Sequence, residues 1–205
     1  EVQSRKDETT TLAADFTSGG ADRWFANLVR DHAGSPAGKD FAQVVRLVEV
    51  SRRIGAEQDP RKVLEYIIDT AIEITGADRG FLILRGTGGA QPGRLTFEVS
   101  RNLGSRDIDE PATKISKGIA ERVIESGEIL LTPNAQTDKR LAALGDVADL
   151  RVRSIVCVPI RMRGAIAGAL YLDSLFTEKA FAEREAALLL VLTDHAAVAL
   201  DNARL

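Results

Sequence analysis

Two apolar runs, Ser154-Ile-Val-Cys-Val-Pro-Ile160 and Ala165-Ile-Ala-Gly-Ala-Leu-Tyr-Leu172, are joined by the short polar link Arg161-Met-Arg-Gly164. Runs of this length, rich in Val, Ile and Leu, are typical of buried strands, and the short link predicts an antiparallel pair. The segment 181–205 follows, and its 25 residues include neither Gly nor Pro. A sheet that leads into a long C-terminal helix is therefore expected.

Upstream of this pair, the pattern predicts two successive helices and a hairpin. Apolar residues at helical spacing over 41–54 end at a glycine, and a second helical pattern begins at Asp59-Pro60 and ends at Gly76. Strands are predicted over 80–84 and 94–100, with a glycine-rich connection between them.

Between the hairpin and the closing strands, the sequence predicts a middle helix and a polar loop. Ser116 is a good N-cap for a helix over 117–125. A short strand over 129–131, a polar stretch over 133–138 and a short helix over 140–144 follow. Residues 1–38 lack sustained periodicity and are expected to form a linker, and residues 39–205 are expected to form one domain whose C-terminal signalling helix spans 181–205.

Composition narrows the possible functions. A net charge of -3, with acidic and basic residues intermixed, argues against direct binding of nucleic acid or of an anionic membrane. The single cysteine, Cys157, excludes an internal disulfide. No apolar stretch is long enough to suggest a membrane span. With no secretory signal and a first residue other than Met, the chain is expected to be part of a longer cytoplasmic protein.

The order of these elements resembles that of the GAF domain family over about residues 42–205. Segments 74–84, 115–128 and 152–160 are similar to the family's first strand, middle helix and first closing strand. Gly168-Ala-Leu-Tyr-Leu-Asp173 and Ala196-Ala-Val-Ala-Leu-Asp-Asn-Ala-Arg-Leu205 are similar to its last strand and exit helix. The chain most resembles GAF domains of bacterial enhancer-binding transcription activators, in which the domain often follows a forkhead-associated domain. Two-component sensor kinases, cyclases and phosphatases contain related domains.

The resemblance implies an α+β, GAF/PAS-like fold: a central antiparallel sheet of five to six strands, a helical layer on one face and a small-molecule pocket on the other. Such domains bind small regulators, or simply dimerise, in front of an output domain, and a non-catalytic sensor is therefore expected here. The polar end of the second strand, the middle helix and the loop suggest walls for the pocket, and the closing strands suggest its floor. The candidate ligand-binding residues are Arg101, Asn102, Ser116, Ile119, Asn134, Thr137, Asp138, Val156, Val158, Tyr171 and Asp173. Ser116 and Asp138 are equally suited to capping helices, a role compatible with ligand binding.

The residues do not indicate a catalytic or metal site. Cys157 lies in an apolar strand, where a thiol acts as a small hydrophobic group, and His195 has no second ligand at a metal-like spacing. The Asn-Lys-x-x-Phe signature of cyclic-nucleotide-binding relatives does not occur in the sequence. The sequence leaves the cofactor unknown, and an enzyme would have to depend on Cys157.

The two terminal helices predict a homodimer. Segments 41–54 and 181–205 both present apolar faces broader than one domain can cover, and pairing with a second copy would bury them. The exit helix would then transmit pocket occupancy to the output domain. The alternative is a ligand-free dimerisation module that sets helix register.

Overall fold

The computed structural model describes residues 56–86, 93–102, 104–144, 147, 150–178 and 180–202. The predicted linker 1–38 and the helix 41–54 lie outside these residues. The elements follow in the order α4 (Pro60–Thr75), β1 (Arg79–Arg85), β2 (Leu95–Asn102), η1 (Pro111–Thr113), α5 (Lys117–Ser126), β3 (Leu130–Thr132), β4 (Ser154–Met162), β5 (Ala165–Ser174) and α7 (Glu183–Asn202).

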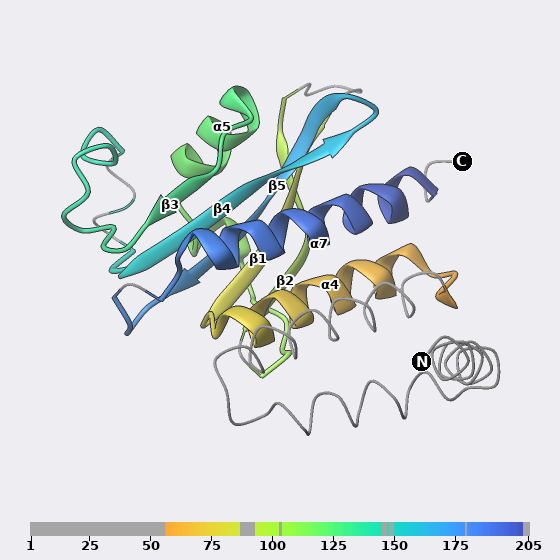
Figure 1. The fold of residues 1–205 in the computed structure, drawn as a ribbon, viewed down its shortest axis with the longest axis horizontal. Helices are drawn as coiled ribbons and strands as arrows, with labels where there is room; N and C mark the ends of the chain where they lie inside the picture. The colour runs from red at the N-terminus through yellow and green to blue at the C-terminus, as the bar shows by residue number, and fades with distance from the viewer. Residues whose placement is uncertain are drawn as a thin grey trace, which may run out of the picture. The chain divides into compact units, whose positions relative to one another are not determined.

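The strands form a five-stranded antiparallel sheet in the order β2-β1-β5-β4-β3 (Figure 1). β4 and β5 pair from Ser154 opposite Ser174 to Met162 opposite Ala165, so the predicted hairpin is confirmed. Its turn places Arg163 and Gly164 at φ 49° and 80°. The α+β fold with an antiparallel sheet is therefore confirmed.

Both helices preceding β4 begin and end at the predicted caps. The Asp59 carboxylate accepts from the Arg61 backbone N–H at 2.9 Å, and Gly76 ends α4 in the left-handed region at φ 68°. The Ser116 hydroxyl accepts from the Ile119 backbone N–H at 3.2 Å at the start of α5. These bonds satisfy backbone donors that the first helical turn leaves free.

Helices α4 and α7 pack against one face of the sheet and against each other (Figure 1). On this face a Cβ added to Gly80 would lie 3.2 Å from the side chain of Ile72 in α4. Side chains alternate between the faces of a strand, so Leu82 shares this face and Phe81 lies on the other. Phe81 clusters with Ile119 and Val123 of α5, which places α5 on the opposite face.

Two details differ from the predictions. Segment 140–144 forms consecutive turns rather than an α-helix. Its backbone hydrogen bonds join residues three apart, not four: the Leu141 N–H donates to the Asp138 carbonyl, and the Leu144 N–H donates to the Leu141 carbonyl. The C-terminal helix begins at Glu183, two residues later than predicted. Within the described residues, no helix combines the length and apolarity needed to cross a membrane.

Candidate functional site

The α5 face of the sheet is organised as rows of paired residues, because residues paired across strands share a face. One row is Leu130, Cys157, Tyr171, Phe81 and Ser100, and the next is Thr132, Ile155, Asp173, Arg79 and Asn102. The first row is mainly apolar, and the second contains several polar side chains. Four predicted site residues lie on this face or beside it: Tyr171, Asp173, Asn102 and Ile119.

Tyr171 is the largest fully buried side chain of this face. Its ring meets Phe81 edge to face, with the ring centroids 5.9 Å apart. Burial raises the pKa of its hydroxyl well above the ordinary value, with the charge of Asp173 adding to the rise and the charge of Arg79 opposing it. The hydroxyl makes no hydrogen bond of good geometry to any described residue, so a buried polar group with unused capacity lies beneath α5.

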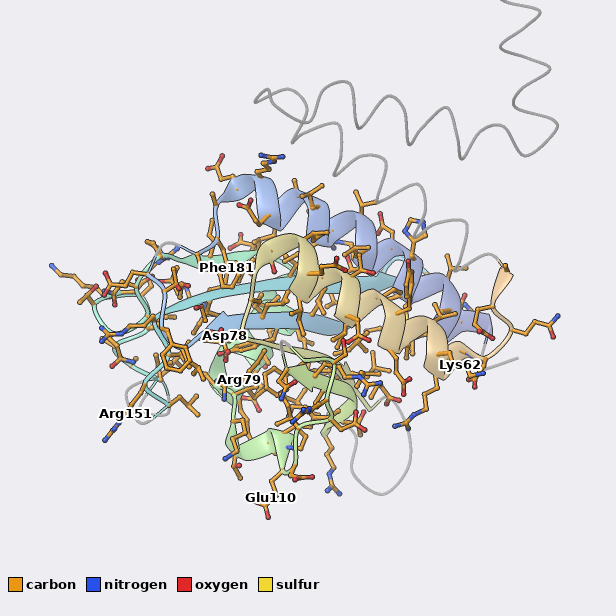
Figure 2. The ribbon with its side chains drawn as sticks, turned by 90° about the horizontal axis from the view of Figure 1, so that it is seen from below. Lys62, Asp78, Arg79, Glu110, Arg151 and Phe181 are labelled. Carbon is orange, nitrogen blue, oxygen red and sulfur yellow. The ribbon has the colours of Figure 1, made fainter. Side chains whose placement is uncertain are left out.

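At the end of the same face, Asp173 forms a bidentate ion pair with Arg79. Arg79 Nε and Nη2 donate to the two carboxylate oxygens at 2.8 Å and 2.6 Å, and the Asp173 side chain is fully buried. Burial raises the pKa of the Asp173 carboxyl to about 6, although the bonds from Arg79 oppose the rise. Figure 2 shows Arg79 beside Asp78, whose carboxylate accepts from Ser174 Oγ and from the Leu175 backbone N–H. These bonds hold the C-terminal end of β5 against the N-terminal end of β1.

A half-open hollow of about 190 Å³ lies in the loop that follows β3. Its apolar lining comes from Ala135, Leu141, Ala142, Leu144 and Val147, and its polar lining from Gln136, Thr137, Asp138 and Lys139. Apolar walls with a few polar groups are typical of small-molecule sites, although this hollow is smaller than most. The predicted residue Asp138 and its neighbour Thr137 line this hollow.

The Asp138 carboxylate is held within its own loop. Arg140 donates to it from Nη2 at 2.6 Å and also donates to the Leu131 carbonyl at 2.8 Å. The side-chain bond from Arg140 is the main reason that the pKa of Asp138 lies well below its usual range, and the Arg140 backbone N–H, 2.9 Å from Oδ1, lowers the pKa further. The side chain therefore stays ionised at neutral pH and shapes the loop.

The remaining polar candidates have structural partners. Ser116 is buried and caps α5, as the capping interpretation predicts. Asn134 donates to Glu178 at 2.9 Å and accepts from the Gln136 backbone at 3.1 Å, so it braces the loop beside the hollow. Asn102 accepts from the backbone N–H groups of Gly104 and Arg106, which closes the turn after β2.

Three predicted residues lie on the wrong face for a site under α5. Arg101 pairs with Gly80, and its guanidinium contacts acids of α4. Val156 and Val158 alternate with Ile155 and Cys157, so they face the α4 and α7 layer, where α7 packs on β4. The β4 side chains that face α5 are instead Ile155 and Cys157. The reason is that β4 is buried on both faces, so its sequence contains no alternation that reveals which residues face α5.

Sequence reasoning missed two residues that organise this side. Arg79 neutralises Asp173, and the Gln136 side-chain amide donates to the Val147 and Val152 carbonyls, which ties the two ends of the loop together. The sequence feature that could have identified Arg79 is a charged residue at the start of an apolar strand. Gln136 has no distinctive signal, because its role depends on how the loop folds back.

Comparisons with known proteins agree with this fold. The family model described as "GAF domain" matches residues 57–201. The chain belongs to the GAF domain family. The GAF domain of a phosphoenolpyruvate-protein phosphotransferase from Acinetobacter superposes with a TM-score of 0.60 at 18% identity, covering 80% of this chain and 95% of that one. The A. Aeolicus nlh2 GAF domain in an inactive state gives a TM-score of 0.58 at 15% identity, covering 80% and 98%.

GAF domains are sensory and regulatory modules, and some structures with this fold are enzymes. One is the free methionine-R-sulfoxide reductase from Thermoplasma acidophilum, with a TM-score of 0.52 at 18% identity over 69% of this chain and 92% of that one. In the present GAF domain Cys157 is fully buried, as predicted, and burial strongly raises the pKa of its thiol. His195 Nδ1 lies 2.8 Å from the Val191 carbonyl of its own helix. Among the described residues, no cluster of three potential metal ligands occurs.

Proposed function

We propose that this GAF domain is a non-catalytic sensor that binds a small organic molecule on its α5 side. The observation that supports the proposal is the hollow in segment 135–147. Its floor residues Ala135, Leu141 and Val147 also belong to the cluster that contains Tyr171 and Ile119. A molecule bound in the hollow would therefore touch the same packed layer that rests on the sheet.

The proposed output pathway is a homodimer formed through α7 and the predicted helix 41–54. On α7, Val191 and Val198 are 42% and 59% exposed and lie seven residues apart, so they share one face of the helix. Leu189, Leu192 and Ala196 are buried on the side that packs on the sheet. A second copy would remove the outer valines from water, and a C-terminal output domain would receive the resulting change in helix packing.

The proposed setting is a longer cytoplasmic signalling protein, such as an enhancer-binding activator or a two-component sensor. Binding to nucleic acid or to a membrane is not part of this proposal, because the net charge is -3.

One observation favours a second function, a ligand-free dimerisation module. The space between α5 and the sheet is filled by the chain's own side chains, including Phe81, Tyr171 and Ile119, each fully buried. In this alternative the hollow has no occupant, and the domain only sets the register of the helices on either side of it.

Native mass spectrometry of the purified protein separates the two functions. A dimer that carries additional mass supports the sensor, and a bare dimer that no compound stabilises supports the dimerisation module. A bare monomer contradicts the dimer in both.

Two substitutions test the hollow. Ala142 lines it, whereas the neighbouring Ala143 is also exposed and does not line it. Ala142→Trp should abolish the added mass or the ligand-induced rise in Tm, while Ala143→Trp should leave both unchanged. Equal effects of the two variants would place the ligand elsewhere.

The dimer surface has its own test. Val191→Glu with Val198→Glu should convert the dimer to a monomer in light scattering, because four carboxylates would enter the contact. Phe176→Glu is the matched control, since Phe176 is 83% exposed and lies outside α7. A dimer that survives the double substitution would place the interface on another surface.

A further inference from the structure

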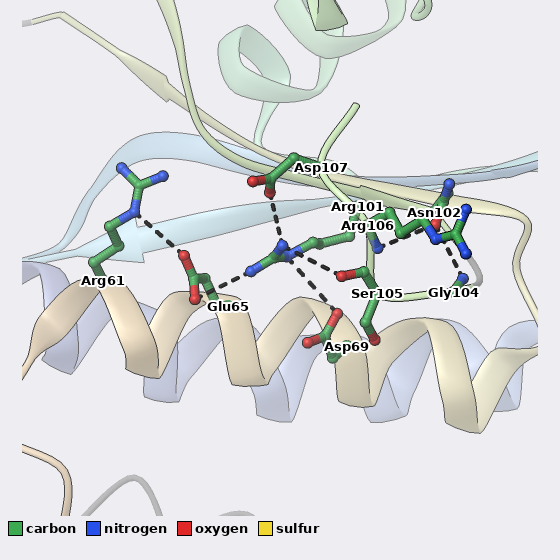
Figure 3. Close-up of polar contacts among 9 residues, drawn as sticks. All are labelled: Arg61, Glu65, Asp69, Arg101, Asn102, Gly104, Ser105, Arg106 and Asp107. Atoms are coloured by element: carbon green, nitrogen blue, oxygen red, sulfur yellow. Dashed lines mark hydrogen bonds and ion pairs between the residues drawn. The ribbon is translucent and has the colours of Figure 1, made fainter. Parts of the chain in front are cut away.

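Arg101 lies at the point where the two faces of the sheet meet at the β2 edge. Its guanidinium binds Asp107 through Nη1 at 2.7 Å and Glu65 through Nη2 at 3.1 Å, and Nε faces Asp69 at 3.9 Å (Figure 3). Only 13% of the Arg101 side chain is exposed. Two of the acids belong to α4, and Asp107 belongs to the turn that leads toward α5.

The turn is built so that Asp107 keeps a fixed position. The Asn102 side chain accepts two backbone N–H groups of the turn, from Gly104 and Arg106, at 3.0 Å and 3.1 Å. Asn102 also donates its backbone N–H to the Arg106 carbonyl. Asp107 then pairs with Arg101 as an isolated antiparallel bridge. These bonds therefore connect the acid to the described residues of the turn.

The residue next to Asp107 belongs to the α5 side. Ile108 packs against the cluster beneath α5, and its backbone N–H donates to the Ser100 carbonyl at 3.1 Å. Segment 107–108 thus contacts the guanidinium through one residue and the α5-side cluster through the next. A displacement of that cluster would reach Arg101 through two consecutive residues.

The contact with Asp69 is incomplete. Asp69 Oδ1 and Arg101 Nε are both buried, they face each other at 3.9 Å, and neither makes a hydrogen bond within the described residues. A charge-assisted N–H···O bond is about 2.7–2.9 Å long, so a relative movement of roughly 1 Å would complete it. Helix shifts of about 1–2 Å are a common form of switching transition.

We propose that Arg101 is a two-position latch between the α5-side segment 102–108 and helix α4. In the present position the guanidinium is bonded to Asp107 and to Glu65 and only loosely engages Asp69. When the turn withdraws Asp107, the guanidinium moves toward Asp69, completes the bond and draws α4 toward β2. Because α4 packs against α7, the shift reaches the exit helix. Only the trigger of the latch, which is ligand binding on the α5 side, rests on the proposed sensor function.

The test uses the ligand-free protein, so that its outcome is independent of ligand binding. Asp107→Asn weakens the turn's hold on Arg101 at a side chain that is 73% exposed, so folding should be unaffected. Asp109→Asn is the matched control, since Asp109 is exposed, lies two residues after Asp107 and makes no ion pair among the described residues. The readouts are the Arg101 Nε to Asp69 distance in a crystal structure and amide hydrogen exchange over residues 65–72.

In Asp107→Asn we expect the distance to fall below about 3.2 Å and the α4 amides to exchange about tenfold more slowly than in Asp109→Asn, as for one added hydrogen bond to a charged group. The reciprocal variant Asp69→Asn should slow exchange in the turn 104–108 instead. If Asp107→Asn leaves α4 unchanged or speeds its exchange, Arg101 is a fixed staple and the latch is wrong. Ligand binding in the mass-spectrometric test would stand in either case.

Discussion

Gly168→Ala provides the sharpest test of the packing at the centre of the sheet. Gly168 lies in β5, the middle strand, paired with Leu84 of β1 on one side and Ile160 of β4 on the other. A Cβ at this position would lie 2.1 Å from the Ile83 carbonyl oxygen and 2.9 Å from Leu84 Cδ2. The first of these atoms is backbone, so a rotamer change cannot relieve the overlap.

The cost follows from separating two strands. Cβ atoms essentially never approach another heavy atom closer than 3.0 Å, so β1 must move about 1 Å away from β5. Overpacking costs roughly 1–3 kcal/mol, and each weakened ladder hydrogen bond adds about 1 kcal/mol. We therefore expect Gly168→Ala to lower the free energy of unfolding by about 3–4 kcal/mol.

Gly80→Ala is the matched control in the neighbouring strand. Its added Cβ would lie 3.2 Å from the Ile72 side chain, which can adjust, so we expect a loss of about 1 kcal/mol or less. Urea unfolding followed by circular dichroism measures both variants, and an unchanged m-value confirms that the unfolded states are comparable. If Gly168→Ala costs no more than Gly80→Ala, the close approach of β1 and β5 at this point is wrong.

Three further predictions concern the α5 side. Asp173 has a pKa of about 6 in the folded protein, above its ordinary 3.8, so the folded state binds the proton more tightly; its contribution to stability should fall by about 1 kcal/mol from pH 5 to pH 7, and this pH dependence should be absent in Asp173→Asn. Cys157 should not react with iodoacetamide in the native protein and should react once urea exposes it, because burial raises the pKa of its thiol; labelling at the native state's rate of global unfolding agrees with this, and faster labelling contradicts it. Ser116→Ala should lower the free energy of unfolding by about 1 kcal/mol through loss of the α5 cap, measured by urea unfolding, and an unchanged free energy would contradict the capping role.

Much of the fold could be predicted because its signals are local. The caps at Asp59 and Ser116 and the glycines at 76 and 127 mark the ends of α4 and α5 through backbone chemistry that acts within a few residues. The β4 and β5 pairing likewise follows from two apolar runs joined by a short turn. The turns at 140–144 are harder to predict from sequence. One turn of α-helix and consecutive turns closed by hydrogen bonds between residues three apart have similar sequence patterns.

The site could be predicted only in part, because face assignment is not local. Tyr171 lies on the α5 face as expected, but Val156 and Val158 do not, since a strand buried on both faces shows no alternation. Arg101 illustrates a second limit. A charged residue at the end of a strand is equally compatible with a ligand and with acids of α4, which lie more than 30 positions earlier in the chain.

The arrangement of contacts indicates where the two faces of the sheet can communicate. The middle strands are packed on both sides and paired on both edges, so a movement through them would break several hydrogen bonds at once. The margins are different. At the β4–β5 turn, Arg161 donates to the Gly127 carbonyl at the end of α5, and Arg163 binds Asp201 near the end of α7 at 3.0 Å. These two side chains reach helices on opposite faces without crossing the core. Because both are largely exposed, exchanging their bonds costs little free energy. We therefore expect substitutions at the margins to change signalling with little loss of stability, and substitutions such as Gly168→Ala to do the reverse.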